Sequence, residues 1–208
     1  VEETKKILNK TKEKGLLLEI NTQYLCSIPP YKKIVSYTDI NSFYFEMEST
    51  WSGKKINYKK IWIDMGPHPL SLLIKLMPKG KIEKGSIDIK SKERENLIKF
   101  IYKNEKNTCD VEIKCVKIEE GIPKRRFGIN KLIIDYSGKN NTQGIYKTYL
   151  TYENKEFEYP DLMNTMIKNF IEAVKSKDQK ILYSTPEAIQ KNMELLIEIY
   201  NSFQNAND

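Results

Sequence analysis

One histidine and one aspartate carry the clearest chemical signal in the sequence. His68 is the only histidine among 208 residues, and Asp64 stands four positions before it, in the stretch Ile61-Trp62-Ile63-Asp64-Met65-Gly66-Pro67-His68-Pro69-Leu70. A neutral imidazole can take a proton from an alcohol or return one to a carbonyl, and a nearby carboxylate can orient the ring. The alternative is that Asp64 only caps a helix and His68 is an ordinary packed residue.

The elements that would position this pair can be predicted from the flanking residues. The apolar run Ile61–Ile63 is typical of a strand, Gly66 and Pro67 then turn the chain, and an apolar helix follows until Pro78 stops it. His68 should therefore lie in the first turn of a helix, close to a strand end. Since a helix N-terminus disfavours the imidazolium, the ring should be largely neutral near pH 7.

Composition indicates a globular chain with one sizeable core, or one domain and the remnant of another. Hydrophobic residues make up 39% and charged residues 30% of the sequence. The net charge is +7, but lysine and glutamate are interspersed throughout. The densest basic run, Lys124-Arg125-Arg126, is interpreted as a solvated strand end and not as a phosphate-binding patch. We therefore expect no nucleic-acid partner.

The three cysteines, Cys26, Cys109 and Cys115, show no metal-ligand spacing. An odd number of cysteines fits a reduced intracellular protein, so we expect a cytoplasmic location and no metal site. We also expect no signal peptide and no membrane partner, because no apolar run reaches the roughly 18 residues that a membrane helix needs.

The N-terminal part of the chain reads as a helix followed by a buried strand. Residues 1–14 have helical character and Gly15 ends them, and Leu16–Ile20 is a continuous apolar run of the kind found in parallel sheets. This is half of a βαβ unit, which suggests that the chain begins inside a domain. Ile28-Pro29-Pro30 is the predicted break between residues 1–28 and a second domain, residues 29–208.

The second domain is predicted to be α+β, with a largely antiparallel, open sheet and helices packed on one face. Strands are expected from alternation, most clearly in residues 109–115, with others around residues 42–48, 87–89, 97–102, 127–129, 132–136 and 145–152. Amphipathic helices are expected at residues 161–176 and after Thr185-Pro186, which form a helix cap and first position. Residues 204–208 are expected to fray.

Four features in order resemble the C-terminal part of Gfo/Idh/MocA-type oxidoreductases. The helix and strand of residues 2–20 resemble the end of that family's Rossmann domain, and Pro29-Pro30-Tyr31 resembles its proline step into the second domain. Asp64-Met65-Gly66-Pro67-His68 resembles its Asp-x-Gly-x-His motif. Residues 161–188, including Asn169-Phe170-Ile171-Glu172-Ala173-Val174 and Thr185-Pro186-Glu187-Ala188, resemble its closing helix pair.

The resemblance implies a nicotinamide-dependent oxidoreductase that acts on a hydroxyl or carbonyl of a sugar, nucleotide sugar or cyclitol. Asp64 and His68 would be the catalytic pair, beside a lysine of a Glu-Lys-Pro motif that would lie before Val1. NAD or NADP would be bound mainly by the Rossmann domain, of which residues 1–28 would be the C-terminal remnant, since no Gly-x-Gly-x-x-Gly loop occurs here. This chain alone is therefore expected to be inactive.

Two segments depart from the family pattern and border its substrate pocket. Tyr24-Leu25-Cys26-Ser27 stands where many relatives have an arginine, and Tyr58-Lys59-Lys60-Ile61 replaces a glycine-rich approach to the motif. Tyr24 and Lys60 are therefore candidate substrate-binding residues, although a solvated role for the lysine is the alternative.

The resemblance also implies a homo-oligomer formed through the open face of the sheet. Tyr146, Tyr149 and Tyr152 are candidate contact residues, because tyrosine is favoured at interfaces. Two other functions remain open: a non-catalytic binding or assembly module descended from the family, and a nucleic-acid-binding domain suggested by the pI of about 9.0.

Overall fold

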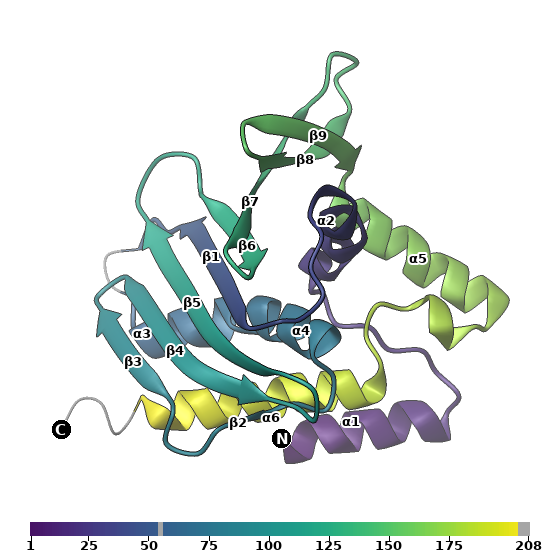
Figure 1. Ribbon diagram of the computed structural model, residues 1–208. Helices are drawn as coiled ribbons and strands as arrows, with labels where there is room; N and C mark the ends of the chain where they lie inside the picture. Colours follow the sequence, from purple (N-terminus) through teal and green to yellow (C-terminus); the bar gives the residue numbers. More distant parts are fainter. Residues whose placement is uncertain (54–55, 204–208) are drawn as a thin grey trace.

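A mixed sheet with helices on one side forms the body of the molecule (Figure 1). The computed structural model describes residues 1–53 and 56–203, and the predicted fraying of residues 204–208 lies outside them. The helical elements are α1 (Glu2–Glu13), η1 (Gln23–Ser27), α2 (Ile28–Ile34), α3 (Tyr58–Met65), α4 (Pro67–Leu76), α5 (Leu162–Ser176), η2 (Gln179–Ile181) and α6 (Pro186–Ser202). The strands are β1 (Ser42–Thr50), β2 (Lys81–Ile82), β3 (Asp88–Lys92), β4 (Glu95–Lys103), β5 (Thr108–Ile118), β6 (Arg125–Ile129), β7 (Leu132–Asn140), β8 (Tyr146–Tyr152) and β9 (Lys155–Pro160).

The sheet is open and largely antiparallel, as predicted. Its order within the described residues is β2-β4-β5-β1-β6-β7-β8-β9, and β3 pairs with β4 outside this path. The central pair β1 and β5 is parallel, whereas the other pairs are antiparallel. The strands expected from alternation are all present, so the α+β prediction for the second domain is confirmed.

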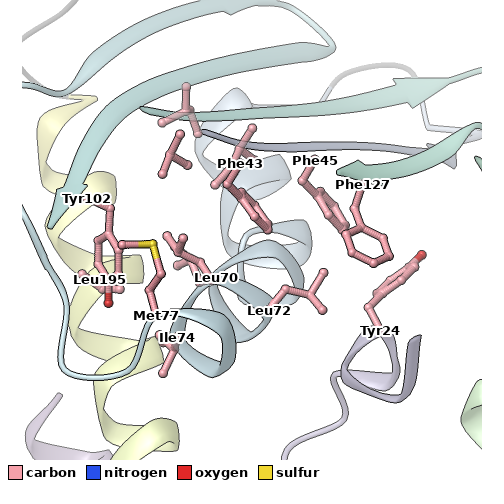
Figure 2. Close-up of a cluster of buried hydrophobic side chains, with 14 of the residues drawn as sticks. Tyr24, Phe43, Phe45, Leu70, Leu72, Ile74, Met77, Tyr102, Phe127 and Leu195 are labelled. Atoms are coloured by element: carbon pink, nitrogen blue, oxygen red, sulfur yellow. The ribbon is translucent and has the colours of Figure 1, made fainter. Parts of the chain in front are cut away.

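One face of the sheet, here called the inner face, packs against α3, α4 and α6. Alternate residues of β1, β5 and β6 point to this face, and Figure 2 shows Phe43, Phe45 and Phe127 directed at Leu70 and Leu72 of α4. Burying each phenylalanine contributes on the order of 1.5–3 kcal/mol. At the β7–β9 end, η1, α2 and α5 lie beside the sheet instead (Figure 1).

The C-terminal helices form as their sequences predict. Asp161 accepts a hydrogen bond from the Asn164 backbone N–H at the start of α5, and Thr185 accepts one from the Ala188 N–H at the start of α6. Each bond satisfies a backbone donor that has no partner inside the helix. Pro186 then takes the first helical position, where its missing N–H costs nothing.

The predicted strand at Ile61–Ile63 is wrong, because these residues belong to α3. The Asn57 side chain accepts a hydrogen bond from the Lys59 N–H and starts a helix whose buried residues are Ile61, Trp62 and Met65. This spacing places the three side chains on one helical face. A short apolar run fits a strand and a buried helix equally well, so its type could not be read from those residues alone.

The predicted strand at Leu16–Ile20 is also wrong, although the preceding helix, α1, is present. Within the described residues this segment is extended but belongs to no sheet, and Leu16 is 53% exposed. Glu19 instead accepts backbone hydrogen bonds from Tyr183 and Ser184. An extended apolar run becomes a strand only where another strand satisfies its backbone groups.

The predicted break at Ile28-Pro29-Pro30 is the start of helix α2, because proline is tolerated in a first helical turn. Tyr24, Leu25 and Tyr31, which lie on both sides of it, are buried in the same core as the sheet. The division into domains at residues 28 and 29 stays a prediction. No helix in residues 1–53 or 56–203 is both long and apolar enough to cross a membrane.

Candidate active site

The junction of α3 and α4 places Asp64 and His68 at one end of the helical layer. His68 is in the first turn of α4, as predicted, and Asp64 is in the last turn of α3. Gly66 joins the two helices, and a Cβ there would come within 2.7 Å of the Trp62 carbonyl oxygen and 2.9 Å of Leu196 on α6. The glycine thus allows the junction to approach α6 closely. The chain reaches the motif from a helix and not from a strand end.

His68 is half-buried, and its ring packs edge-on against Tyr24, with 5.2 Å between ring centroids. Burial lowers the pKa of His68 below its usual value; the charge of Asp64 opposes this shift, and the charge of Arg125 adds to it. Among the residues that the structure describes, none hydrogen-bonds to the buried Nδ1 of His68. The ring is therefore held neutral near pH 7 by burial, in agreement with the predicted charge state.

Asp64 contacts a lysine instead of the histidine ring. The Nζ of Lys117 donates to Asp64 Oδ2 at 2.6 Å and to Ser49 Oγ at 3.2 Å. The Lys117 side chain is only 5% exposed, whereas that of Asp64 is 63% exposed. Asp64 does not cap α4, whose N-cap is Gly66, so the capping alternative is wrong. Asp64 acts on His68 through its charge.

Four polar residues lie in a row across the inner face, beside Asp64 and His68. Lys117 of β5 pairs in register with Ser49 of β1, and Arg125 of β6 pairs with Met47 of β1. On β7, Ile134 pairs with Phe127 of the inner face, so Tyr136, two residues further on, points to the same face. We call Lys117, Ser49, Arg125 and Tyr136 the inner polar row. The rest of this face is mostly apolar.

Arg125 and three tyrosines gather next to His68. Arg125 lies close enough to the Tyr24 hydroxyl to hydrogen-bond it, but burial dominates and raises the pKa of Tyr24. The rings of Tyr24 and Tyr136 lie 5.3 Å apart. Tyr146 lies over Gly138 of β7, because a Cβ on that glycine would collide with the Tyr146 hydroxyl oxygen.

The predicted substrate-binding residues are separated. Tyr24 is buried beside His68, whereas Lys60 is exposed on α3. Lys60 lines a groove with Asp64 and Tyr200 that neither His68 nor Tyr24 lines. The structure thus brings Tyr24 into contact with His68, whereas Lys60 shares a groove with Asp64 alone among the predicted site residues.

Sequence reasoning missed Lys117 and Arg125, although a signal for both was present. The alternation from Cys109 to Cys115 puts position 117 on the inner face, and the spacing of Phe127 and Ile129 does the same for position 125. The interpretation of Lys124-Arg125-Arg126 as a solvated strand end is therefore wrong for Arg125. A cation that breaks an inward-facing apolar pattern is the signal that could have found these residues.

Two other hollows lie elsewhere on the molecule. A cavity of about 590 Å³ lies between α1, residues 15–18 and the start of α6, and one of about 450 Å³ lies between α4 and α6. Neither is lined by His68 or Tyr24. No group of three or more potential metal-ligating histidine, cysteine or acidic side chains occurs within residues 1–53 and 56–203.

The described residues do not fit a dinucleotide cofactor by themselves. Within residues 1–53 and 56–203, β1 and β5 are the one parallel pair of the sheet, and the chain between them forms α3, α4 and then β2, β3 and β4, which is not a simple βαβ crossover. The apolar run of residues 16–20 is in no sheet. The described residues therefore provide no strand end with a glycine loop of the kind that binds a dinucleotide in a Rossmann domain.

Three solved structures that are similar to this chain are oxidoreductases. UDP-N-acetylglucosamine 3-dehydrogenase GnnA from Acidithiobacillus ferrooxidans is 12% identical, with a TM-score of 0.67 over 96% of this chain and 66% of that one. Dehydrogenase MviM from Clostridium difficile is 14% identical, with a TM-score of 0.59 over 95% and 66%. KijD10, a 3-ketoreductase from Actinomadura kijaniata solved with TDP-benzene and NADP, is 11% identical, with a TM-score of 0.59 over 95% and 65%.

These neighbours are Gfo/Idh/MocA-type oxidoreductases, as the motif resemblance implies. No protein-family model and no curated protein matches the chain. The chain spans 66% of the length of the first two structures. It therefore has the fold of about two-thirds of a Gfo/Idh/MocA-type oxidoreductase.

Proposed function

We propose that this chain is the substrate-binding part of a nicotinamide-dependent oxidoreductase that acts on a hydroxyl or carbonyl of a sugar, nucleotide sugar or cyclitol. The observation that carries the proposal is the neutral, half-buried His68 in the first turn of α4, beside Tyr24 and the inner polar row. The fold shared with GnnA and KijD10 supports it.

His68 supplies the acid–base part of such a reaction. A neutral imidazole accepts the proton of a substrate hydroxyl as the carbonyl forms, and returns it in the opposite direction. Asp64 favours the protonated ring by its charge, while Lys117 holds the Asp64 carboxylate in place at 2.6 Å. NAD or NADP would have to be held by another domain, on the same polypeptide or on a partner.

The finer parts of the proposal concern assembly and location. We propose a homo-oligomer through the outer face of the sheet. The three predicted contact tyrosines do not share a face, because residues 146, 149 and 152 cannot all have the same parity on one strand. Tyr149 is on the outer face, and Tyr146 and Tyr152 are on the inner face, so only Tyr149 remains a candidate. A cytoplasmic location fits three free, buried cysteines.

Turnover is the direct test. The chain, together with its nucleotide-binding domain, is assayed with NAD and NADP against a panel of sugars, nucleotide sugars and cyclitols. His68→Gln should lower turnover by roughly 10²–10⁴-fold, the usual worth of a positioned acid–base group, and should leave the melting temperature nearly unchanged. Arg126→Gln, on the outer face, is the matched control and should retain turnover.

A non-catalytic binding or assembly module makes the opposite prediction. The panel would then bind without turnover, and His68→Gln would change nothing but local packing. Full activity in folded His68→Gln would likewise remove His68 from the mechanism.

A further inference from the structure

Arg125 is the one arginine of the described residues that forms no ion pair. Arg94 pairs with Glu119 at 2.6 Å, and Arg126 pairs with both Glu46 and Asp135. Arg125 forms no such pair within residues 1–53 and 56–203, and its Nε is buried without a hydrogen-bond partner there. A partly buried cation with an unsatisfied donor is costly, and an anionic acceptor at this position would remove that cost.

The carboxylates around this group are already engaged. Asp64 accepts from Lys117 at 2.6 Å, and Asp161 accepts the Asn164 N–H at 2.8 Å where it caps α5. Both influence the site only by charge, Asp64 on His68 and Asp161 on Tyr136. The described part of the chain thus leaves Arg125 able to bind an anion from elsewhere.

Hydroxyl groups that can donate to the same anion surround Arg125. Tyr24 and Tyr136 both lie near its charge, and Tyr146, which is 51% exposed, lies over Gly138 on the same face. The absent Cβ of Gly138 gives the Tyr146 ring its place, since a methyl group there would collide with the phenol. Side chains from η1, β6, β7 and β8 therefore converge beside His68.

We propose that Arg125, with the Tyr24 and Tyr146 hydroxyls, binds an oxyanion group of the substrate, a carboxylate or a phosphoryl group, beside the carbon that faces His68. The guanidinium fork matches both groups and binds them through two parallel hydrogen bonds. The inference rests on the proposed function and narrows the substrate class to anionic sugars or cyclitols. A carboxylate and a phosphoryl group would bind the guanidinium in the same way, and the titrations described below distinguish them.

The test uses acetate and inorganic phosphate as probes. Because His68 is the only histidine, its ring protons give one set of NMR signals that report on the site directly. Each anion is titrated at constant ionic strength, with sodium chloride as the reference salt. The expected result is saturable movement of the His68 signals; tighter binding of acetate indicates a carboxylate, and tighter binding of phosphate indicates a phosphoryl group.

Arg125→Gln and Arg126→Gln are the matched variants, since they remove equal charge from opposite faces of one strand. Arg125→Gln should weaken binding of the anion at least about tenfold, because it removes the charged hydrogen bonds to the guanidinium. Arg126→Gln should leave affinity unchanged, and Gly138→Ala should weaken it by displacing Tyr146. Equal loss in both arginine variants, or no saturable response in the wild type, overturns the inference.

Failure here can be told apart from failure of the proposed function. If neutral sugars turn over and His68→Gln abolishes turnover, but neither anion binds at Arg125, the oxidoreductase proposal stands and the anionic substrate class falls. If the anions bind at Arg125 but no substrate in the panel turns over, the binding site stands without the catalytic role.

Discussion

The two faces of the sheet each carry a row of polar residues, and the rows differ in how their charges are compensated. On the outer face an ion-pair ladder crosses five strands, with Lys99 and Glu112 at 2.7 Å and Lys114 and Glu46 at 3.3 Å, and it ends at Arg126 and Asp135. On the inner face, Lys117 forms an ion pair with one carboxylate, that of Asp64, and Arg125 forms no ion pair within the described part of the chain.

This difference in charge compensation indicates a different role for the polar row on each face of the sheet. Exposed ion pairs add about 0–1 kcal/mol each and keep a sheet face compatible with water. Partly buried, uncompensated cations reduce stability, and proteins keep such groups mainly at functional sites. We infer that the outer ladder serves solubility or assembly and that the inner polar row serves binding and proton transfer.

The largest effect on stability within these rows should follow from breaking the Lys117–Asp64 pair. Asp64→Asn leaves a cation that is 5% exposed without its carboxylate, which should lower the free energy of unfolding by about 1–3 kcal/mol. The 63% exposure of Asp64 keeps the loss below that of a fully buried pair. Urea unfolding measures it, and Asp64→Asn combined with Lys117→Met should recover most of the loss. A double variant no more stable than Asp64→Asn would contradict this account.

The pKa of His68 should respond in opposite directions to its two charged neighbours. Arg125→Gln removes a repelling charge and should raise the pKa, whereas Asp64→Asn should lower it. NMR titration of the single histidine measures both. Because the folded pKa lies below the unfolded value of about 6.5, His68 contributes stability above that pH, which is lost as pH falls through the folded pKa. His68→Gln should remove this part of the pH dependence, and the same slope in the variant would exclude it.

The smallest effect is expected on the outer ladder. Arg126→Gln removes contacts to Glu46 and Asp135, but the Arg126 side chain is 40% exposed and solvent screens its pair with Asp135. The Glu46 side chain is 8% exposed and keeps Lys114 as a partner at 3.3 Å. The free energy of unfolding should fall by about 0.2–1 kcal/mol, and by less at high salt. A loss larger than that of Asp64→Asn would reverse the comparison between the faces.

Alternation and capping signals predicted most of the fold. The strand at residues 109–115 and the helix started by Thr185 and Pro186 follow from residues close in sequence. The runs Ile61–Ile63 and Leu16–Ile20 were assigned wrongly because their structure depends on partners far along the chain. Asn57 and the packing on α6 make the first a helix, and the absence of a neighbouring strand in the described residues leaves the second merely extended.

The candidate site was predictable only in part, for the same reason. The position of His68 in a first helical turn and its neutral state follow from local residues and burial. The other residues of the site come from η1 and from β5, β6 and β7, and the register of the three strands decides which of their side chains meet. Lys60 illustrates the limit, because it lines a groove with Asp64, one helical turn away on α3, and yet this groove is not lined by His68 or Tyr24.

The parallel pairing of β1 with β5 has a consequence for how the protein folds. It joins residues 42–50 to residues 110–118, whereas β4 with β5 and β7 with β8 are local hairpins that need little loop closure. Pairings between distant segments form slowly, so the hairpins should form before the central pair. Lys117 meets Ser49 only when that pair has formed. A chain with near-native strand content can therefore still lack its site, and activity should return later than secondary structure during refolding.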